Sequence, residues 1–108
     1  MPFIPHAEIP GRVPMAGFHG RFLHTERVTI VYWDIEEGAV LPEHSHPHEQ
    51  ITHILSGRFE MTISGETRTF GPELVAVIPG NAVHSGRAIT RCTALDVFQP
   101  VRVDYKPK

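Results

Sequence analysis

Residues 44–50, His-Ser-His-Pro-His-Glu-Gln, form the densest group of potential metal ligands in the chain. His44 and His46 have the same parity, so their side chains point the same way on an extended strand. Gln50 shares that parity, but on a straight strand it would lie roughly 13 Å beyond His46, too far to share an ion. The chain must therefore turn between them, and Pro47 is a residue that cannot continue a central strand. The spacing predicts a metal site formed by two neighbouring strands that a hairpin-like bend connects.

The elements that position these side chains are expected to be strands. Runs of β-branched and aromatic residues, or clean polar–apolar alternation, are separated by turn residues at short intervals. The expected strands cover residues 28–35, 40–46, 50–55, 58–64, 67–70, 74–78 and 91–99. Prolines and glycines interrupt residues 1–20, which we interpret as an irregular N-terminal arm that lies over the domain or over a partner subunit. Residues 21–108 are expected to form a single all-β barrel domain.

Composition excludes several classes of protein. A chain of 108 residues with a net charge of -2 and scattered lysines and arginines has no basic stripe for nucleic acid or an anionic membrane. Cys92 is the only cysteine, so no intrachain disulfide is possible and a reducing compartment fits. The N-terminus does not resemble a signal peptide, and no apolar run approaches the ~20 residues of a membrane helix. The sequence therefore predicts a soluble, cytoplasmic protein.

A carboxylate near the C-terminus is the second chemical feature. On the expected strand 91–99, Asp96 and Phe98 share one face and the two residues beside Asp96 share the other. If the latter face outward, Asp96 points into the barrel, where a buried carboxylate must be paired or functional. Arg102 could supply the compensating charge, which leaves a structural Asp96–Arg102 pair as the alternative.

Two separated motifs resemble the signatures of the cupin superfamily. The first contains Gly38, His44, His46, Gln50 and Gly57, and the second is Ile-Pro-Gly-Asn-Ala-Val-His, which ends at His84. The resemblance implies a double-stranded β-helix, or cupin jelly roll, with one metal ion bound inside the barrel by His44, His46, Gln50 and His84. The usual glutamate ligand of the family is Gln50 here.

The amide at position 50 has an electrostatic consequence. Three neutral imidazoles and a neutral amide leave a divalent ion its full charge, whereas a glutamate would cancel one unit. The amide-ligated ion should therefore be the stronger Lewis acid. Imidazole ligands suit several divalent transition metals, so Zn, Ni, Fe, Mn and Cu are not distinguished.

Residues 96–105, together with the His-Pro-His-Glu-Gln run, resemble a narrower group, the KdgF-type cupins of pectin and alginate breakdown. This resemblance extends from about residue 38 to residue 105. It implies conversion of a 4,5-unsaturated uronate monosaccharide from its ring form to the linear keto acid. It also implies that Asp96 is the acid/base, that Phe98 forms a wall of the sugar pocket, and that Arg102 anchors the substrate carboxylate.

Two other functions stay open at this stage. The metal site could activate dioxygen, as in a cupin dioxygenase, or the barrel could bind a sugar without turnover. His48 is expected beside the site rather than as a ligand, and Glu49 has the wrong parity to replace Gln50. The histidines at positions 6, 19, 24 and 53 are expected to be structural. We further expect a homodimer that pairs through an outer sheet face, the arm and residues 28–35.

Overall fold

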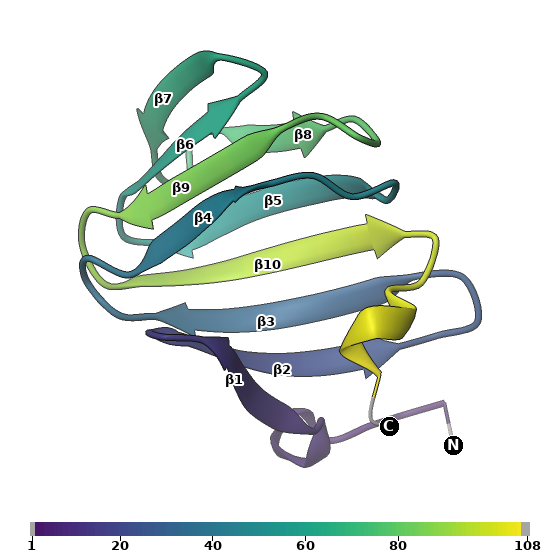
Figure 1. Cartoon of the computed structure of the whole chain (residues 1–108). Coiled ribbons are helices and arrows are strands. Elements are labelled where there is room, and N and C mark those ends of the chain that lie inside the picture. Colours follow the sequence, from purple (N-terminus) through teal and green to yellow (C-terminus); the bar gives the residue numbers. More distant parts are fainter. Residues whose placement is uncertain (1, 107–108) are drawn as a thin grey trace.

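Ten strands in two facing antiparallel sheets make up the fold in the computed structural model, which describes residues 2–106 (Figure 1). The six-stranded sheet has the order β1 (Gly11–Met15), β2 (Phe18–His24), β3 (Thr29–Ile35), β10 (Cys92–Gln99), β5 (Glu49–Ser56) and β8 (Val75–Ile78). The four-stranded sheet has the order β4 (Val40–His44), β9 (His84–Ala88), β6 (Phe59–Ile63) and β7 (Glu66–Phe70). Two short 3-10 turns, η1 (His6–Glu8) and η2 (Val103–Tyr105), lie outside the sheets. This arrangement confirms the expected all-β jelly roll.

The core lies between the sheets because burial alternates along the strands. In β3 and β10 every second residue is buried, as expected for strands with one face on a core. The largest inward side chains are aromatic or branched, and burying each one stabilises the fold by about 1.5–3 kcal/mol. They include Phe18, Phe22, Trp33, Ile54, Phe59 and Phe98.

The structure corrects the expected irregular arm at residues 1–20. Residues 11–24 contain β1 and β2, so within the described part of the arm only residues 2–10 and the turn at residues 16–17 lie outside strands. Pro14 is tolerated because β1 is an edge strand, where one side of the backbone has no partner. Gly20 is needed within β2, since a Cβ there would lie 2.7 Å from the ring of Trp33. Met1 of the expected arm and residues 107–108 of the expected domain lie outside the described residues.

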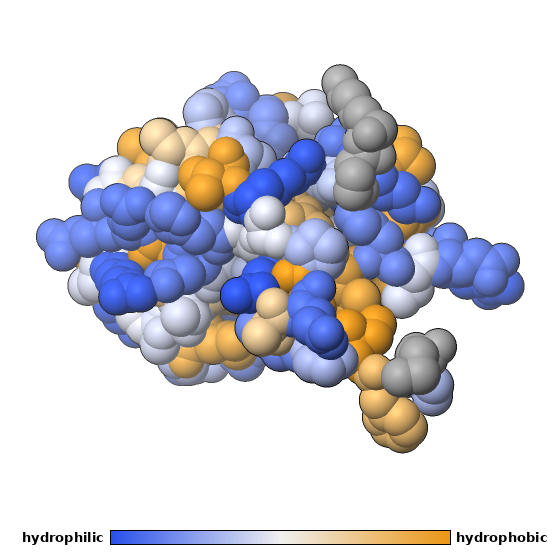
Figure 2. All heavy atoms as spheres, turned by 90° about the horizontal axis from the view of Figure 1, so that it is seen from below, coloured by the Kyte–Doolittle hydropathy of each residue, from blue (hydrophilic) through white to orange (hydrophobic). Residues whose placement is uncertain are grey.

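Residues 2–10 pack against the domain that they precede. The guanidinium of Arg21 on β2 donates hydrogen bonds to the carbonyl oxygens of Ala7 and Ile9, at 2.9 and 3.0 Å. Figure 2 views this side of the molecule and shows hydrophilic residues over much of the face, with hydrophobic ones in smaller, separate patches. Within residues 2–106, no helix is long and apolar enough to cross a membrane.

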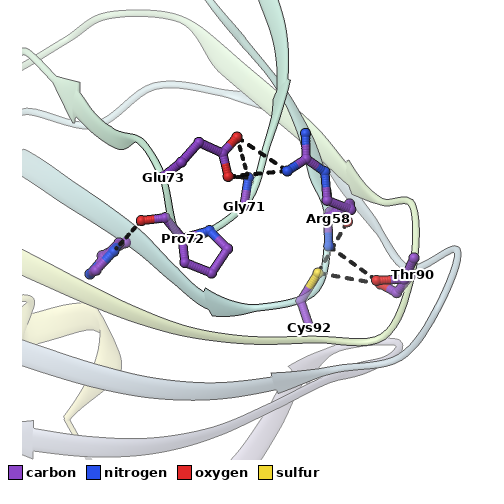
Figure 3. Close-up of polar contacts among 7 residues, drawn as sticks. Arg58, Gly71, Pro72, Glu73, Thr90 and Cys92 are labelled. Carbon is purple, nitrogen blue, oxygen red and sulfur yellow. Dashed lines mark hydrogen bonds and ion pairs between the residues drawn. The ribbon is translucent and has the colours of Figure 1, made fainter.

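A cluster of polar contacts ties three turns together at the end of the barrel where β5, β7 and β9 finish (Figure 3). The Glu73 carboxylate accepts hydrogen bonds from the backbone N–H of Gly71 and from the guanidinium of Arg58, each at 3.1 Å. The backbone N–H of Arg58 donates to the hydroxyl of Thr90 at 3.0 Å, and the thiol of Cys92 donates to the Arg58 carbonyl at 3.2 Å. These contacts connect the turns at this end of the barrel, and the opposite end is where β4 ends at His44 and β9 begins at His84.

Candidate metal centre

Three histidines from three segments converge at that end of the barrel. His44 ends β4 and His84 begins β9, and the two residues are direct cross-strand partners. His46 follows in the connection to β5. One ring nitrogen from each histidine lies within 4.8 Å of the others, and His46 and His84 are 9% and 1% exposed. The expected histidine cluster is therefore confirmed as a group that could hold one metal ion.

The connection from His44 to Gln50 differs from the expected hairpin. β4 belongs to the four-stranded sheet and β5 to the six-stranded sheet, so the segment around Pro47 crosses between the sheets. The turn that brings Gln50 back towards His46 is correct, but the two strands are not neighbours in one sheet. The second neighbouring strand of the site is β9, which residue patterning did not predict because polar residues and Gly86 interrupt it.

The hydrogen bonds of the three histidines leave their Nε2 atoms available to bind a cation. The Nδ1 atoms of His44, His46 and His84 lie 2.9, 3.1 and 2.9 Å from backbone carbonyl oxygens, to which a protonated Nδ1 donates. In a neutral imidazole this leaves Nε2 with a free lone pair. Nε2 of His84 is buried without a hydrogen-bond partner among the described residues. An orphaned buried acceptor beside two similar nitrogens fits a bound metal ion.

Gln50 places an amide oxygen beside this cluster. Its Oε1 atom lies 3.1 Å from Nε2 of His46, so two acceptor atoms face one another when Nδ1 carries the ring proton. Burial, with the nearby charges of Arg102 and His84, lowers the pKa of His46 to about 4, so the neutral ring prevails near pH 7. A shared cation resolves the repulsion between the two lone pairs.

Asp96 lies deeper in the barrel, next to Gln50. The side chain is 8% exposed and burial raises the pKa of its carboxyl, although hydrogen bonds oppose the shift. The hydroxyl of Thr52 donates to Oδ1 at 2.6 Å, and the indole N–H of Trp33 donates to Oδ2 at 2.8 Å. Asp96 thus points inward, as predicted, with two neutral donors on its carboxylate.

Arg102 does not form the structural pair with Asp96 that the sequence left open. Its Nε and Nη2 atoms donate to the Asp104 carboxylate at 3.0 and 2.6 Å. The guanidinium carbon lies 4.8 Å from the ring centre of Phe98 and 4.1 Å from that of Tyr105. Because Arg102 is only 7% exposed, these contacts hold its charge at the barrel mouth beside Phe98.

One cavity is lined by several of these groups. The cavity has a volume of about 40 Å³, and its polar lining residues include His44, Gln50, Thr52, Asp96 and Arg102, with Phe98 beside them. Apolar residues from both sheets line its inner part, and Met15 and Phe18 of the N-terminal strands contribute to it.

A family model for the cupin domain matches residues 31–98. The chain belongs to the cupin family. Its structure is similar to KdgF from Halomonas sp., with a TM-score of 0.88 and 28% identity over 96% of this chain and 97% of that one. An RmlC-like cupin from Shewanella frigidimarina shares the fold, with a TM-score of 0.89 and 20% identity over 96% and 95% of the two chains. No curated protein sequence matches.

Larger cupins share the fold as well. Oxalate decarboxylase from Bacillus subtilis, a protein with Mn(II) centres, matches with a TM-score of 0.77 and 19% identity. The match covers 90% of this chain but 29% of that one. At this identity the similarity concerns the fold alone.

The remaining histidines of this cupin make other contacts. His48 lies outside the cluster among the described residues, and its carbonyl accepts the hydrogen bond from His46. Glu49 is exposed. Contacts with neighbouring groups hold the others: His6 packs on Tyr32, and His19, His24 and His53 lie within hydrogen-bond distance of Glu36, Thr29 and the Pro72 carbonyl.

Four residues of the cavity region had not been recognised from the sequence: Trp33, Thr52, Asp104 and Tyr105. Thr52 has the parity of Gln50, and Trp33 lies in a clearly alternating strand, so their inward direction was readable. Their contacts with Asp96 depend on the pairing of β10 with both β3 and β5, which the patterning does not reveal.

Proposed function

We propose that this cupin converts 4,5-unsaturated uronate monosaccharides from the ring form to the linear keto acid. The observation that carries the proposal is the placement of one buried carboxylate, Asp96, and one buried guanidinium, Arg102, in the cavity of the histidine cluster. The similarity to KdgF over nearly the whole chain supports it. The substrate would be a small sugar acid, and the cofactor one divalent transition metal ion.

The metal would be held by His44, His46, His84 and Gln50. These residues fit a cation because each histidine keeps an unprotonated Nε2 and Gln50 presents an amide oxygen. A bound divalent ion supplies Lewis-acid stabilisation of negative charge that develops on a substrate oxygen. None of these four side chains carries a negative charge, so they leave this electrostatic effect undiminished.

Asp96 would move the protons. Opening the ring removes a proton from the anomeric hydroxyl, forms the C1 carbonyl, breaks the bond from C1 to the ring oxygen, and leaves an enolate. A proton delivered to C4 then gives the ketone at C5, so the reaction is an isomerisation without net loss or gain of atoms. Asp96 can accept the first proton and return one to C4, because each carboxylate oxygen keeps a lone pair besides those used by Thr52 and Trp33.

Arg102 and Phe98 would hold the sugar. A guanidinium binds a carboxylate through two parallel hydrogen bonds, and the Phe98 ring beside it offers an apolar wall. The Asp104 carboxylate already uses Nε and Nη2 of Arg102 in this way. A substrate carboxylate that binds there takes the place of Asp104.

An anaerobic ultraviolet assay tests this function. Wild-type protein with bound metal should accelerate the loss of the conjugated alkene's absorbance when a 4,5-unsaturated uronate is added, without consuming oxygen or a nucleotide. Decay at the spontaneous rate would contradict the proposal. Turnover only with oxygen would favour a dioxygenase, and binding with the sugar recovered unchanged would favour a sugar-binding protein.

A further inference from the structure

A buried line of hydrogen bonds runs from the proposed metal ligand Gln50 to Asp96. The amide nitrogen of Gln50 donates to the hydroxyl oxygen of Thr52 at 2.9 Å, and this hydroxyl donates to Oδ1 of Asp96 at 2.6 Å. The indole of Trp33 occupies the other oxygen of Asp96 at 2.8 Å. All four residues are at most 8% exposed, so bulk solvent has little access to these hydrogen bonds.

The direction of each bond in this line follows from the previous one. A carboxylate only accepts hydrogen bonds, so the single hydroxyl proton of Thr52 goes to Asp96. The Thr52 oxygen can then only accept, which draws the NH₂ end of the Gln50 amide towards it. The oxygen end of the amide is left facing His46, where Oε1 lies 3.1 Å from Nε2.

This orientation matters because an amide has one good metal-binding end. The carbonyl oxygen can ligate a cation, whereas the NH₂ group presents protons to it. A carboxylate at the same position would offer an oxygen in either orientation. The amide therefore needs an orienting partner that a glutamate would not need.

We propose that Thr52 is a positioning residue that keeps the oxygen of Gln50 towards the metal. Because its hydroxyl donates to Asp96, its oxygen can only accept from the amide NH₂ of Gln50. The inference rests on the metal ligands proposed above but does not depend on the uronate reaction. Asp96 thereby has a second task, which is to set the direction of the hydroxyl of Thr52.

The first experiment measures the affinity of metal-stripped protein for Co²⁺, together with the visible spectrum of the bound ion. Thr52→Val keeps the shape of the side chain and removes the hydroxyl, so Co²⁺ affinity should fall about 10–100-fold, as for other partners of metal ligands. The matched variant Thr52→Ser keeps the hydroxyl and should bind within about threefold of wild type, with the wild-type spectrum. If Thr52→Val fails to fold, Thr52→Ala serves in its place.

A double-mutant cycle separates orientation from a general packing effect. In the Gln50→Glu background, Thr52→Val should change Co²⁺ affinity less than about threefold, because either carboxylate oxygen can ligate. Wild-type affinity and spectrum in Thr52→Val would overturn the inference. An equal loss in both backgrounds would overturn it as well, since the effect would then be structural.

Asp96→Asn provides an independent arm. Its amide oxygen can accept from Trp33 while its NH₂ group donates to Thr52, which reverses the line and turns the NH₂ end of Gln50 towards the histidines. Co²⁺ affinity should therefore fall in Asp96→Asn and recover when Gln50→Glu is added. Failure of this rescue would contradict the positioning role of Thr52, whereas absence of Co²⁺ binding by wild-type protein would contradict the metal site itself.

Discussion

At the residue scale, position 50 decides the charge of the centre. Gln50 is 4% exposed and its oxygen lies beside Nε2 of His46. A carboxylate in this place would neutralise one unit of charge on a divalent ion in a site where little water screens it. The amide therefore favours Lewis-acid strength over affinity for the metal.

Gln50→Glu tests this balance. The added negative charge should tighten metal binding and slow uronate turnover at equal metal loading, because the ion then stabilises the enolate less well. Elemental analysis gives the loading and the ultraviolet assay gives kcat. A variant that turns over faster than wild type at equal loading would refute the electrostatic reasoning.

Asp96→Asn tests proton transfer. With Co²⁺ at a concentration that saturates the site, kcat should fall about 10²–10⁴-fold, the usual contribution of a placed acid/base group. Asp34→Asn is a suitable control, because Asp34 is also a strand aspartate, but it pairs with Arg91 at the surface. A kcat close to wild type in metal-saturated Asp96→Asn would remove Asp96 from the mechanism.

At the element scale, the segment that follows β10 positions Arg102, which we propose binds the substrate. The backbone N–H of Arg102 donates to the buried hydroxyl of Thr29 at 2.8 Å, which fixes where the chain leaves the sheet. The turn η2 then places Asp104 and Tyr105 around the guanidinium. Asp104 is the more exposed partner of the ion pair, with 54% of its side-chain surface accessible against 8% for Arg102.

Asp104→Asn should lower KM for the uronate severalfold and leave kcat nearly unchanged. The substitution removes a carboxylate that competes with the substrate for Arg102 and repels its charge. Arg102→Ala should raise KM instead, because the substrate then loses roughly 1.5–3 kcal/mol of binding free energy. Steady-state kinetics of both variants decides the matter. An increase in KM for Asp104→Asn would show that Asp104 orients Arg102 rather than competing for it.

Strands with clear alternation are predictable from the sequence, and several strands that contain a proline or glycine are not. β3, β5, β6 and β10 were located to within one or two residues because each has one face on the core. β1 and β2 were not predicted because Pro14 and Gly20 resemble residues that end a strand. Pro14 is tolerated because β1 is an edge strand, and Gly20 is required because the Trp33 ring leaves no room for a side chain. The histidine cluster followed from its two motifs, whereas the partners of Asp96 required strand pairing that lies far apart in sequence.

At the scale of the whole molecule, a row of apolar residues crosses the outer face of the six-stranded sheet. Leu23, Ile30, Val97, Ile51 and Val77 follow one another across five strands as direct cross-strand partners. Each alternates with inward residues, so the row faces away from the cavity and spans about 19 Å. Such a face is suited to an isologous contact with a second copy.

We expect a homodimer through this face. Ile51→Lys should shift the molar mass in light scattering from dimer to monomer at micromolar concentration, because it places a charge in the centre of the contact. Val40→Lys is the matched control, since Val40 is a similarly exposed apolar residue on the other sheet. A wild-type protein that is monomeric across this range would contradict the dimer.

The most direct test of the proposed activity follows ring opening by proton NMR under nitrogen, with metal-stripped and metal-restored protein. With the stripped protein, the uronate should open only at its spontaneous rate. One equivalent of a divalent transition metal should restore accelerated conversion to the linear keto acid. His84→Ala, which lacks one histidine of the cluster, should not respond to added metal. Equal conversion by stripped and restored protein, or none by either, would contradict a metal-dependent uronate ring-opening cupin.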